Sequence, residues 1–505
     1  MKDTINLRRA AHWRRLVLYG AGILALLYAV LFIPDRKHEV PKGAGKQPFV
    51  WNQDALWAEL EQQLEDARHA GCASLTDRLD KAMAELDRLS AEISSKSLDP
   101  ENETFLEMEK TVFGIAPLLG ACPGRLSEFA AKINRARTNV KNQSERWDLN
   151  SPEARQRLYR LLFGMRMALE EVMLQAPTEQ AAPEFLLCDD EPSQTPGTRL
   201  LGVTVHSGDI LVSRGGAPTS ALIARGNDYP GSFSHVALVH VDEKSGSASV
   251  IESHIERGVA VSSLQQYLDD KKLRIMVLRL RADLPVLSAD PLIPHKAATG
   301  AKEAVRTRHI PYDFTMNYRD HGSQFCSEVA SAAYEAVGVK LWMGVSFISS
   351  RTVTAWLASL GAEHFETQEP SDLEYDPQLR VVAEWRDRST LFKAHVDDAV
   401  TDVMLEEAKP NEGLGYSRLM LPPARLSKGY SVVLNWVGKI GPVPEGMSAV
   451  TALRVRRYRD QHVAIANQVL VLAEEFEKKH GYRPPYWKLI TLAKIAKSDV
   501  KQRIQ

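Results

Sequence analysis

Cysteine is scarce in this chain, and the spacings typical of metal sites are missing altogether. Only four of the 505 residues are cysteine, so each thiol needs its own account. No C-x-x-C, H-x-x-x-H or comparable spacing occurs, which argues against an ordinary zinc site. The formal net charge is −1, so electrostatics favour neither nucleic acid nor a broadly acidic partner. We expect no cofactor and no metal ion.

A long uncharged run occurs at the N-terminus, over residues 16–33 between Arg15 and Pro34. Eighteen residues at about 1.5 Å each approach the hydrocarbon thickness of a bilayer. The run ends in "LFIPDRKHEV", without a small-x-small cleavage site. The cations before it predict a cytoplasmic tail over residues 1–15: Lys2, Arg8, Arg9, Arg14 and Arg15. We expect an uncleaved transmembrane signal anchor over 16–34. The rest of the chain would then be extracytoplasmic, in the periplasm if the source is a Gram-negative bacterium with this helix in its inner membrane.

Hydrophobic periodicity divides the remainder into three parts. Apolar residues at three- and four-residue spacing predict a helical bundle or stalk over 50–178, which is also a candidate protein-binding region. A Pro-, Gln- and acid-rich stretch predicts a linker over 179–199. Short Val- and Ile-rich runs and two helical segments predict an α+β domain over 200–365. A mostly helical C-terminal extension over 366–505, with a long helix near 449–480, carries no recognisable chemistry.

The cysteines outside the α+β domain suggest a disulfide. Cys72 and Cys122 both lie beside glycines at breaks between helical segments, and Cys188 lies in the linker. An oxidising compartment would allow a Cys72–Cys122 bridge. Three pairings are open if Cys326 stays free, and unpaired buried thiols are the alternative.

Cys326 lies in the stretch "HGSQFCSEVASAAYEAVGV", at the start of a predicted helix. With Ser323 as the N-cap, Gln324 and Cys326 fall in the first turn. The helix dipole and the unpaired N–H groups there lower a thiol pKa and can stabilise an oxyanion. A lone cysteine on a helix is otherwise a small buried hydrophobe, so this thiol needs partners to be a nucleophile.

Candidate partners occur on two predicted strands. In "GSFSHVALVHV", His235 opens a strand after a Gly/Ser-rich turn and shares a face with Ala237. In "VIESHIERGV", Glu252 and His254 share one face of the next strand, and either could orient the His235 ring. A surface histidine and an ordinary cross-strand polar pair are the alternatives.

The order of four motifs resembles the permuted papain-like amidases of the YiiX/YaeF type, relatives of the NlpC-type peptidases and of the lecithin:retinol acyltransferase family. The motifs are "GDILVS", "SHVALV", "VIES" and "YDF…FCSEV", between Gly208 and about Ala362. The resemblance implies a papain-like fold with Cys326 as nucleophile, His235 as base and Glu252 as third member. It also implies a structural Asp209 in a turn near the site and a pocket-lining Tyr312 followed by Asp313. Ser253 stands where the family often has alanine, which leaves His254 open as the third member, and Gln324 is a further pocket candidate.

Competing interpretations remain open at this point. A metal site drawn from His235, His240, Glu252, His254 or His321 lacks a suitable spacing. A membrane-anchored, non-catalytic scaffold is the second alternative. For the enzyme, thioester chemistry covers peptide amides, such as those of the cell wall, and lipid acyl groups, by hydrolysis or transfer. Arg214 and Arg225, before His235, are candidates to bind a carboxylate or phosphate at the pocket rim.

Overall fold

The structure is a computed structural model that describes residues 41–51, 53–177 and 184–504, together with residues 18–19, 21–22, 25–26 and 28–35. Parts of the predicted anchor over 16–34 therefore lie outside the described residues, as does the whole tail over 1–15. Among the residues that are described, no helix combines the length and the apolar character that crossing a membrane requires.

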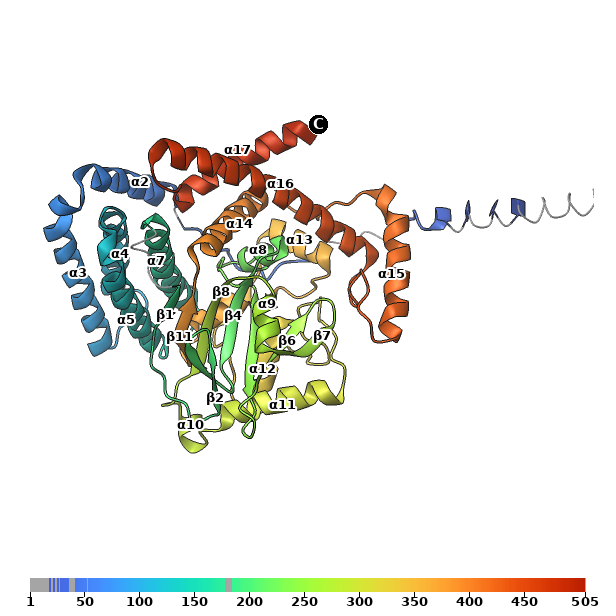
Figure 1. The fold of residues 1–505 in the computed structure, drawn as a ribbon, viewed down its shortest axis with the longest axis horizontal. Coiled ribbons are helices and arrows are strands. Elements are labelled where there is room, and N and C mark those ends of the chain that lie inside the picture. Colours follow the sequence, from blue (N-terminus) through green and yellow to red (C-terminus); the bar gives the residue numbers. More distant parts are fainter. Residues whose placement is uncertain are drawn as a thin grey trace, which may run out of the picture.

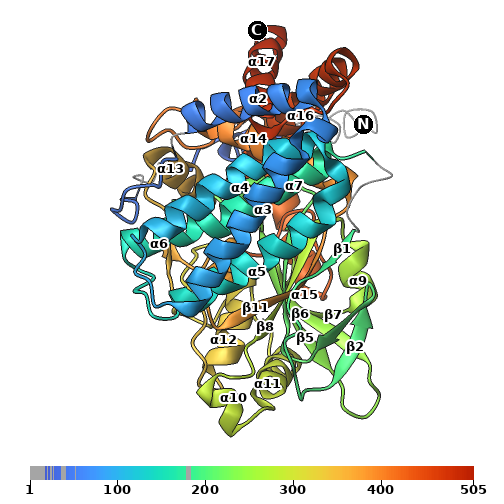
Figure 2. The ribbon, with the colours of Figure 1, turned by 90° about the vertical axis from the view of Figure 1, so that its left-hand side faces the viewer.

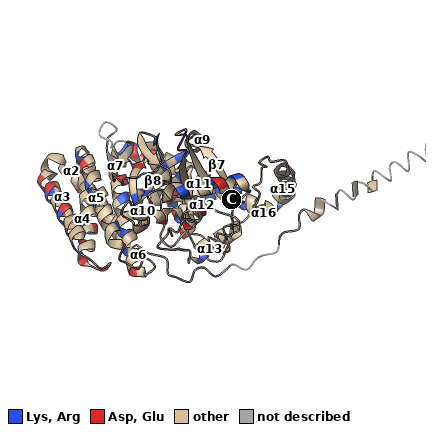
Figure 3. Cartoon of the chain, turned by 90° about the horizontal axis from the view of Figure 1, so that it is seen from below, with Lys and Arg blue, Asp and Glu red and all other residues tan. Residues whose placement is uncertain are grey.

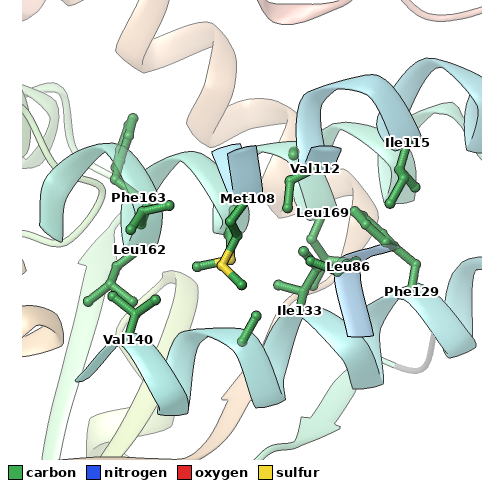
Figure 4. Close-up of a cluster of buried hydrophobic side chains, with 14 of the residues drawn as sticks. Leu86, Met108, Val112, Ile115, Phe129, Ile133, Val140, Leu162, Phe163 and Leu169 are labelled. Carbon is green, nitrogen blue, oxygen red and sulfur yellow. The ribbon is translucent and has the colours of Figure 1, made fainter. Parts of the chain in front are cut away.

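The first folded layer is a helical bundle, blue to teal in Figures 1 and 2. Its apolar positions recur at helical spacing and face one another, and Figure 4 shows part of this buried cluster at the centre of the bundle. The side chain of Asn102 caps one of the helices by accepting a hydrogen bond from the Thr104 N–H. The helices are α2 (Gln53–Ala70), α3 (Cys72–Ser95), α4 (Glu103–Ala121), α5 (Leu126–Ser144), α6 (Pro152–Leu158) and α7 (Gly164–Gln175).

A disulfide joins Cys72, the first residue of α3, to Cys122 at the end of α4, with their Cα atoms 4.9 Å apart. The predicted pairing is therefore confirmed. Cys188 and Cys326 are free thiols.

The second layer is a seven-stranded antiparallel sheet in the order β1-β11-β8-β4-β5-β6-β7, which confirms an α+β fold. Two neighbouring strands at one side of the sheet come from outside the predicted 200–365 segment: β1 from the expected linker and β11 from the expected C-terminal extension. The strands are β1 (Phe185–Leu187), β4 (Ile210–Gly215), β5 (His235–Val241), β6 (Ala248–His254), β7 (Gly258–Ser263), β8 (Lys272–Leu280) and β11 (Leu379–Trp385). Two separate strand pairs are β2 (Gly197–Leu200) with β3 (Val203–His206), and β9 (Ser346–Phe347) with β10 (Glu366–Thr367).

The two faces of the sheet have different partners. Val236 and Leu238 share a core with the helices α11 (Ile293–Thr307) and α12 (Cys326–Glu335). Ala237 and Val239 belong to a separate core with the β2–β3 pair and α9 (Leu264–Asp269). The alternation along β5 is the one expected of a strand buried on both faces.

The bundle packs beside the sheet (Figure 1), so the segment forms the bundle of the predicted bundle or stalk. Residues 41–50 run back over the α+β domain to reach it, where the N–H groups of Ala44 and Phe49 donate to Ile348 and Asp228. Buried ion pairs then join bundle to sheet: Arg137 with Glu374 and Glu384 at 2.7 and 2.8 Å, and Glu170 with Arg274 at 2.7 Å.

The C-terminal extension is mostly helical, and the predicted long helix is α16 (Ala449–His480). With α13 (Arg351–Leu360), α14 (Arg388–Glu406) and α17 (Tyr486–Ile504) it forms a third core along the upper edge of Figure 1. The helix α15 (Leu421–Trp436) lies at the end of the molecule from which the N-terminal segment extends. The remaining short helices are α8 (Pro218–Arg225) and α10 (Pro285–Ala289).

Candidate active site

Cys326 is the first residue of α12, so the prediction of an N-cap at Ser323 is wrong by two positions. Phe325 takes the N-cap position, and the carboxyl group of Glu328 accepts a hydrogen bond from its N–H at 2.9 Å. The helix does not begin earlier because the backbone of Gln324 is bonded to segments outside the helix. Its N–H donates to the carbonyl of Pro311 at 2.9 Å, and its own carbonyl accepts from Ser253 Oγ at 2.6 Å.

The thiol lies where β5 and β6 separate. The β5–β6 ladder begins at Ala237 and Glu252, so the backbone of β5 before Ala237 is not paired with β6. Cys326 Sγ occupies this position, 3.8 Å from the carbonyl oxygen of Ser234 and next to the Val236 N–H. The sulfur therefore contacts the backbone on both sides of His235.

Burial dominates the ionisation of the thiol. Cys326 is 6 % exposed, and burial raises its pKa to about 12, although the N–H groups of Val236 and Ser327 act in the opposite direction. The expectation that the helix start alone lowers this pKa is therefore wrong for the resting protein. The dipole effect is limited to fractions of a kcal/mol at a helix end, whereas desolvation of a buried thiolate costs several.

His235 and Glu252 meet across β5 and β6. Glu252 Oε2 lies 2.8 Å from His235 Nε2, and Glu252 Oε1 lies 3.2 Å from His254 Nε2, so the carboxylate sits between two imidazoles. Burial alone would raise the pKa of Glu252, but the hydrogen bonds from both histidines outweigh it and hold this pKa far below its ordinary value. Burial lowers the pKa of His235, and the Glu252 contact offsets only part of that shift.

This arrangement defines the chemistry available to His235. A carboxylate at Nε2 favours the tautomer with its proton on Nε2, which leaves Nδ1 as the basic nitrogen. Among the described residues, no hydrogen bond joins Cys326 Sγ to the His235 ring. Hydrogen bonds of this kind are often long or absent before substrate binds, and both groups are neutral in this state.

Tyr312 and Asp313 lie on the segment that precedes the cysteine helix. The Asp313 carboxylate accepts hydrogen bonds from the N–H groups of Thr315 and Asn317, both at 2.7 Å, so it holds the turn. The Tyr312 ring lies 4.8 Å from that of Phe314. Burial raises the pKa of Tyr312 well above its ordinary value, and the next largest influence is the nearby Cys326.

Three predicted residues take no part at this site. Both carboxylate oxygens of Asp209 accept hydrogen bonds from Arg279 at 2.8 Å. Asp209 directly precedes β4, four residues before Ser213, which lies opposite His235 in the β4–β5 ladder. Four strand residues span about 13 Å, so the turn that Asp209 holds lies at the other end of the strand from the thiol. Arg214 pairs with Asp398 at 2.6 Å and Arg225 with Asp402 at 2.8 Å, both on α14, because their side chains point into the core.

Glu369 is a buried carboxyl group that no sequence motif indicated. It precedes a short 3₁₀ turn (Pro370–Tyr375), and its backbone is held by Ser346 Oγ at 2.8 Å and Trp342 Nε1 at 3.0 Å. Burial raises its pKa to about 8, so it is protonated at neutral pH. When ionised, it would raise the pKa of Cys326 further.

The histidines considered for a metal site are dispersed. His240 faces away from His235, with its Nδ1 3.2 Å from Lys302 Nζ and its ring stacked on His295. His321 pairs with Glu335 at 3.1 Å. Over the described ranges, no group of three or more histidine, cysteine, aspartate or glutamate side chains is arranged to hold a metal ion.

The α+β domain matches a known family. Residues 204–383 match the model of a family described as permuted papain-like amidase enzyme, YaeF/YiiX, C92 family. The matched segment runs from β3 into β11 and contains Cys326, His235 and Glu252. It confirms the resemblance expected from the order of the motifs and supports an amidase- or peptidase-like hydrolase. No curated protein matches the chain.

Proposed function

We propose that this chain, whose residues 204–383 match the model of a permuted papain-like amidase family, is a membrane-anchored cysteine hydrolase that cleaves amide bonds through a Cys326–His235–Glu252 triad. One observation carries the proposal: the Cys326 sulfur lies against the backbone that flanks His235, and Glu252 holds the far nitrogen of the His235 ring at 2.8 Å. His254, on the other oxygen of Glu252, is a positioning residue in this proposal.

The proposed reaction starts from a neutral Cys326 thiol and a neutral His235 imidazole. On substrate binding, Nδ1 of His235 removes the Cys326 proton while the sulfur attacks the carbonyl carbon. The backbone N–H of Cys326, at the start of α12, is free of helical pairing and is the oxyanion donor that we propose. The imidazolium, stabilised by Glu252, then protonates the leaving amine. Water, deprotonated by His235, hydrolyses the thioester and restores the thiol.

The cellular setting in this proposal follows from the N-terminus and the disulfide. A transmembrane helix over 16–34 would hold the catalytic domain outside the cytoplasm, attached to the inner membrane if the organism is Gram-negative. The Cys72–Cys122 bridge fits an oxidising compartment such as the periplasm. Peptide amides of the cell wall are then within reach, and they are the substrates that we propose.

Product analysis tests this function. The full chain and its Cys326→Ala variant are incubated with purified peptidoglycan sacculi and, separately, with vesicles of a phospholipid extract, and mass spectrometry identifies the products. We expect new peptide ends from sacculi with the wild type alone. Products from lipid alone would replace the proposed substrate by lipid acyl groups. No Cys326-dependent product in either mixture would favour a non-catalytic scaffold.

A further inference from the structure

One helix of the C-terminal extension exposes an apolar face that the proposed hydrolase does not use. Along α15 and the residue that follows it, apolar side chains recur at intervals of four, three and four residues: Leu426, Tyr430, Val433 and Val437 are 58, 59, 53 and 65 % exposed. Trp436 beside them is 81 % exposed. The flanking residues continue the surface: Leu419, Met420 and Ile440. We call these eight residues the α15 face. A contiguous exposed apolar surface of this kind marks a binding site.

Along the chain, the charged residues of α15 and its flanking segments are of one sign. Between Glu412 and Glu445 the chain has four cations and no acidic residue, in a protein whose net charge is −1. The cations are Arg418, Arg425, Lys428 and Lys439. A helix with an apolar stripe, exposed tryptophan and tyrosine, and lysine or arginine alongside is typical of segments that lie in the interface of an anionic membrane.

The N-terminal apolar segment lies beside this helix. Arg425 of α15 donates to the carbonyl of Leu31 at 3.0 Å and to the Asp35 carboxylate at 2.5 Å. Figure 1 shows the described parts of residues 18–35 extending away from the body of the protein, crosswise to α15, and Figure 3 shows both at the same end. Any bilayer that takes up the apolar run over 16–33 therefore has its surface at α15.

We propose that the α15 face docks into the interfacial layer of the bilayer, with anionic lipid headgroups around Arg418, Lys428 and Lys439, because Arg425 is already paired with Asp35. A helix crosswise to a spanning segment lies in the membrane plane, which suits an interfacial helix and not a second span. A second copy of the chain or a protein partner could cover an apolar face, but neither accounts for the adjacent apolar run or for the absence of acidic residues along the chain between Glu412 and Glu445.

Docking would also fix the orientation of the candidate active site. Lys428 of α15 donates to the carbonyls of Pro444 and Glu445 at 2.8 and 2.6 Å, and the Glu445 carboxylate pairs with His309 at 2.8 Å. His309 belongs to the segment that leads to Tyr312, next to the thiol. Hydrogen bonds and an ion pair thus connect α15 to the segment from His309 to Tyr312 beside the thiol. The docked helix would hold this segment close to the membrane surface.

Depth-dependent quenching tests the docking. The full chain is reconstituted in phosphatidylethanolamine–phosphatidylglycerol vesicles whose acyl chains are brominated near the headgroup, and the Trp436→Phe variant is measured in parallel. The difference between the two emission spectra isolates Trp436. We expect most of this difference signal to be lost in brominated vesicles and retained in unbrominated ones. An unquenched Trp436 in vesicle-bound protein overturns the proposal. Emission typical of a solvated tryptophan would then show that the α15 face is open to water. Emission that depends on the protein-to-lipid ratio would indicate that a second copy of the chain covers it.

A charge-insertion pair provides the matched control. Val433→Glu with Val437→Glu places two carboxylates on the α15 face, and we expect quenching of Trp436 to disappear. Val463→Glu with Val471→Glu makes the same change at two exposed valines of α16, 42 and 50 % exposed, and should leave quenching intact. Persistence of quenching in the α15 double variant would also contradict the proposal. The measurement reads lipid contact, so its outcome does not depend on whether Cys326 is catalytic.

Discussion

Glu252 lies 2.8 Å from Nε2 of His235, on the strand next to it, and its second oxygen contacts His254. The contact therefore links His235, the first residue of β5, to Glu252 in the neighbouring strand β6. It occupies Nε2 of the imidazole, so Nδ1 is the nitrogen that the proposed mechanism assigns to the thiol.

Replacing Glu252 with glutamine should abolish this orientation while keeping the shape of the side chain. An amide can present its N–H to Nε2 and so favour the wrong tautomer. We expect kcat to fall by about 10²- to 10⁴-fold, with little change in KM. The matched variant His254→Asn removes the outer partner only and should cost less than about tenfold. Equal losses in the two variants would mean that His254 contributes as much as Glu252 to orienting the His235 ring.

The resting thiol should be slow to alkylate at neutral pH. With its pKa near 12, the thiolate fraction of Cys326 rises about tenfold for each pH unit between neutrality and pH 10. Peptide mapping after iodoacetamide treatment should show that slope for Cys326 up to pH 10, whereas in urea the rate should level off above about pH 9, because an unfolded thiol has a pKa of about 8.5. Cys188, whose pKa burial raises to about 11, serves as the internal reference. A rate that is already maximal near pH 7 would show a preformed thiolate and contradict the neutral-pair mechanism.

Glu369 should make folding stability depend on pH. Its folded pKa of about 8 lies above the ordinary value of 4.5, so the folded protein binds the extra proton between these two values. The stabilisation is full below about pH 4.5 and is lost as pH rises to about 8, at up to about 1.4 kcal/mol per unit. Urea unfolding of the wild type and Glu369→Gln should show this difference in slope. Parallel profiles across that window would mean that Glu369 ionises as freely in the folded protein as in the unfolded one.

The Cys72–Cys122 bridge should stabilise the bundle. It closes a loop over a sequence separation of 50, for which chain entropy predicts about 4 kcal/mol. We expect Cys72→Ser with Cys122→Ser to lower the free energy of unfolding by up to that amount, measured by circular dichroism in urea. Cys188→Ser is the control, because that thiol is free. Unchanged stability in the double variant would mean that packing between α3 and α4 alone holds the bundle.

Local patterns in the sequence predict much of this fold. The alternation around His235 and Glu252 predicts both strands and the faces on which these residues lie. The helical periodicity predicts the bundle and the long helix α16. The order of four short motifs predicts the family that residues 204–383 match. These features depend on neighbours within a few residues, or on their order along the chain.

Long-range packing accounts for what the sequence does not predict. β1 and β11 belong to segments that the sequence predicts to be a linker and a C-terminal extension. They pair across nearly 200 residues of chain, and such a pairing leaves no signal in the local sequence. Arg214 and Arg225 resemble rim residues until their partners on α14 are known. The high thiol pKa of Cys326 likewise arises from the burial around it.

The thioester is the most direct test of the central claim. The wild type and Cys326→Ala are mixed with whichever substrate mixture is turned over, quenched in acid on the millisecond-to-second scale, and digested for mass spectrometry. We predict an acyl adduct on the Cys326 peptide of the wild type that hydroxylamine removes, and no turnover by Cys326→Ala. Turnover by Cys326→Ala, or an adduct on a different residue, would contradict the account.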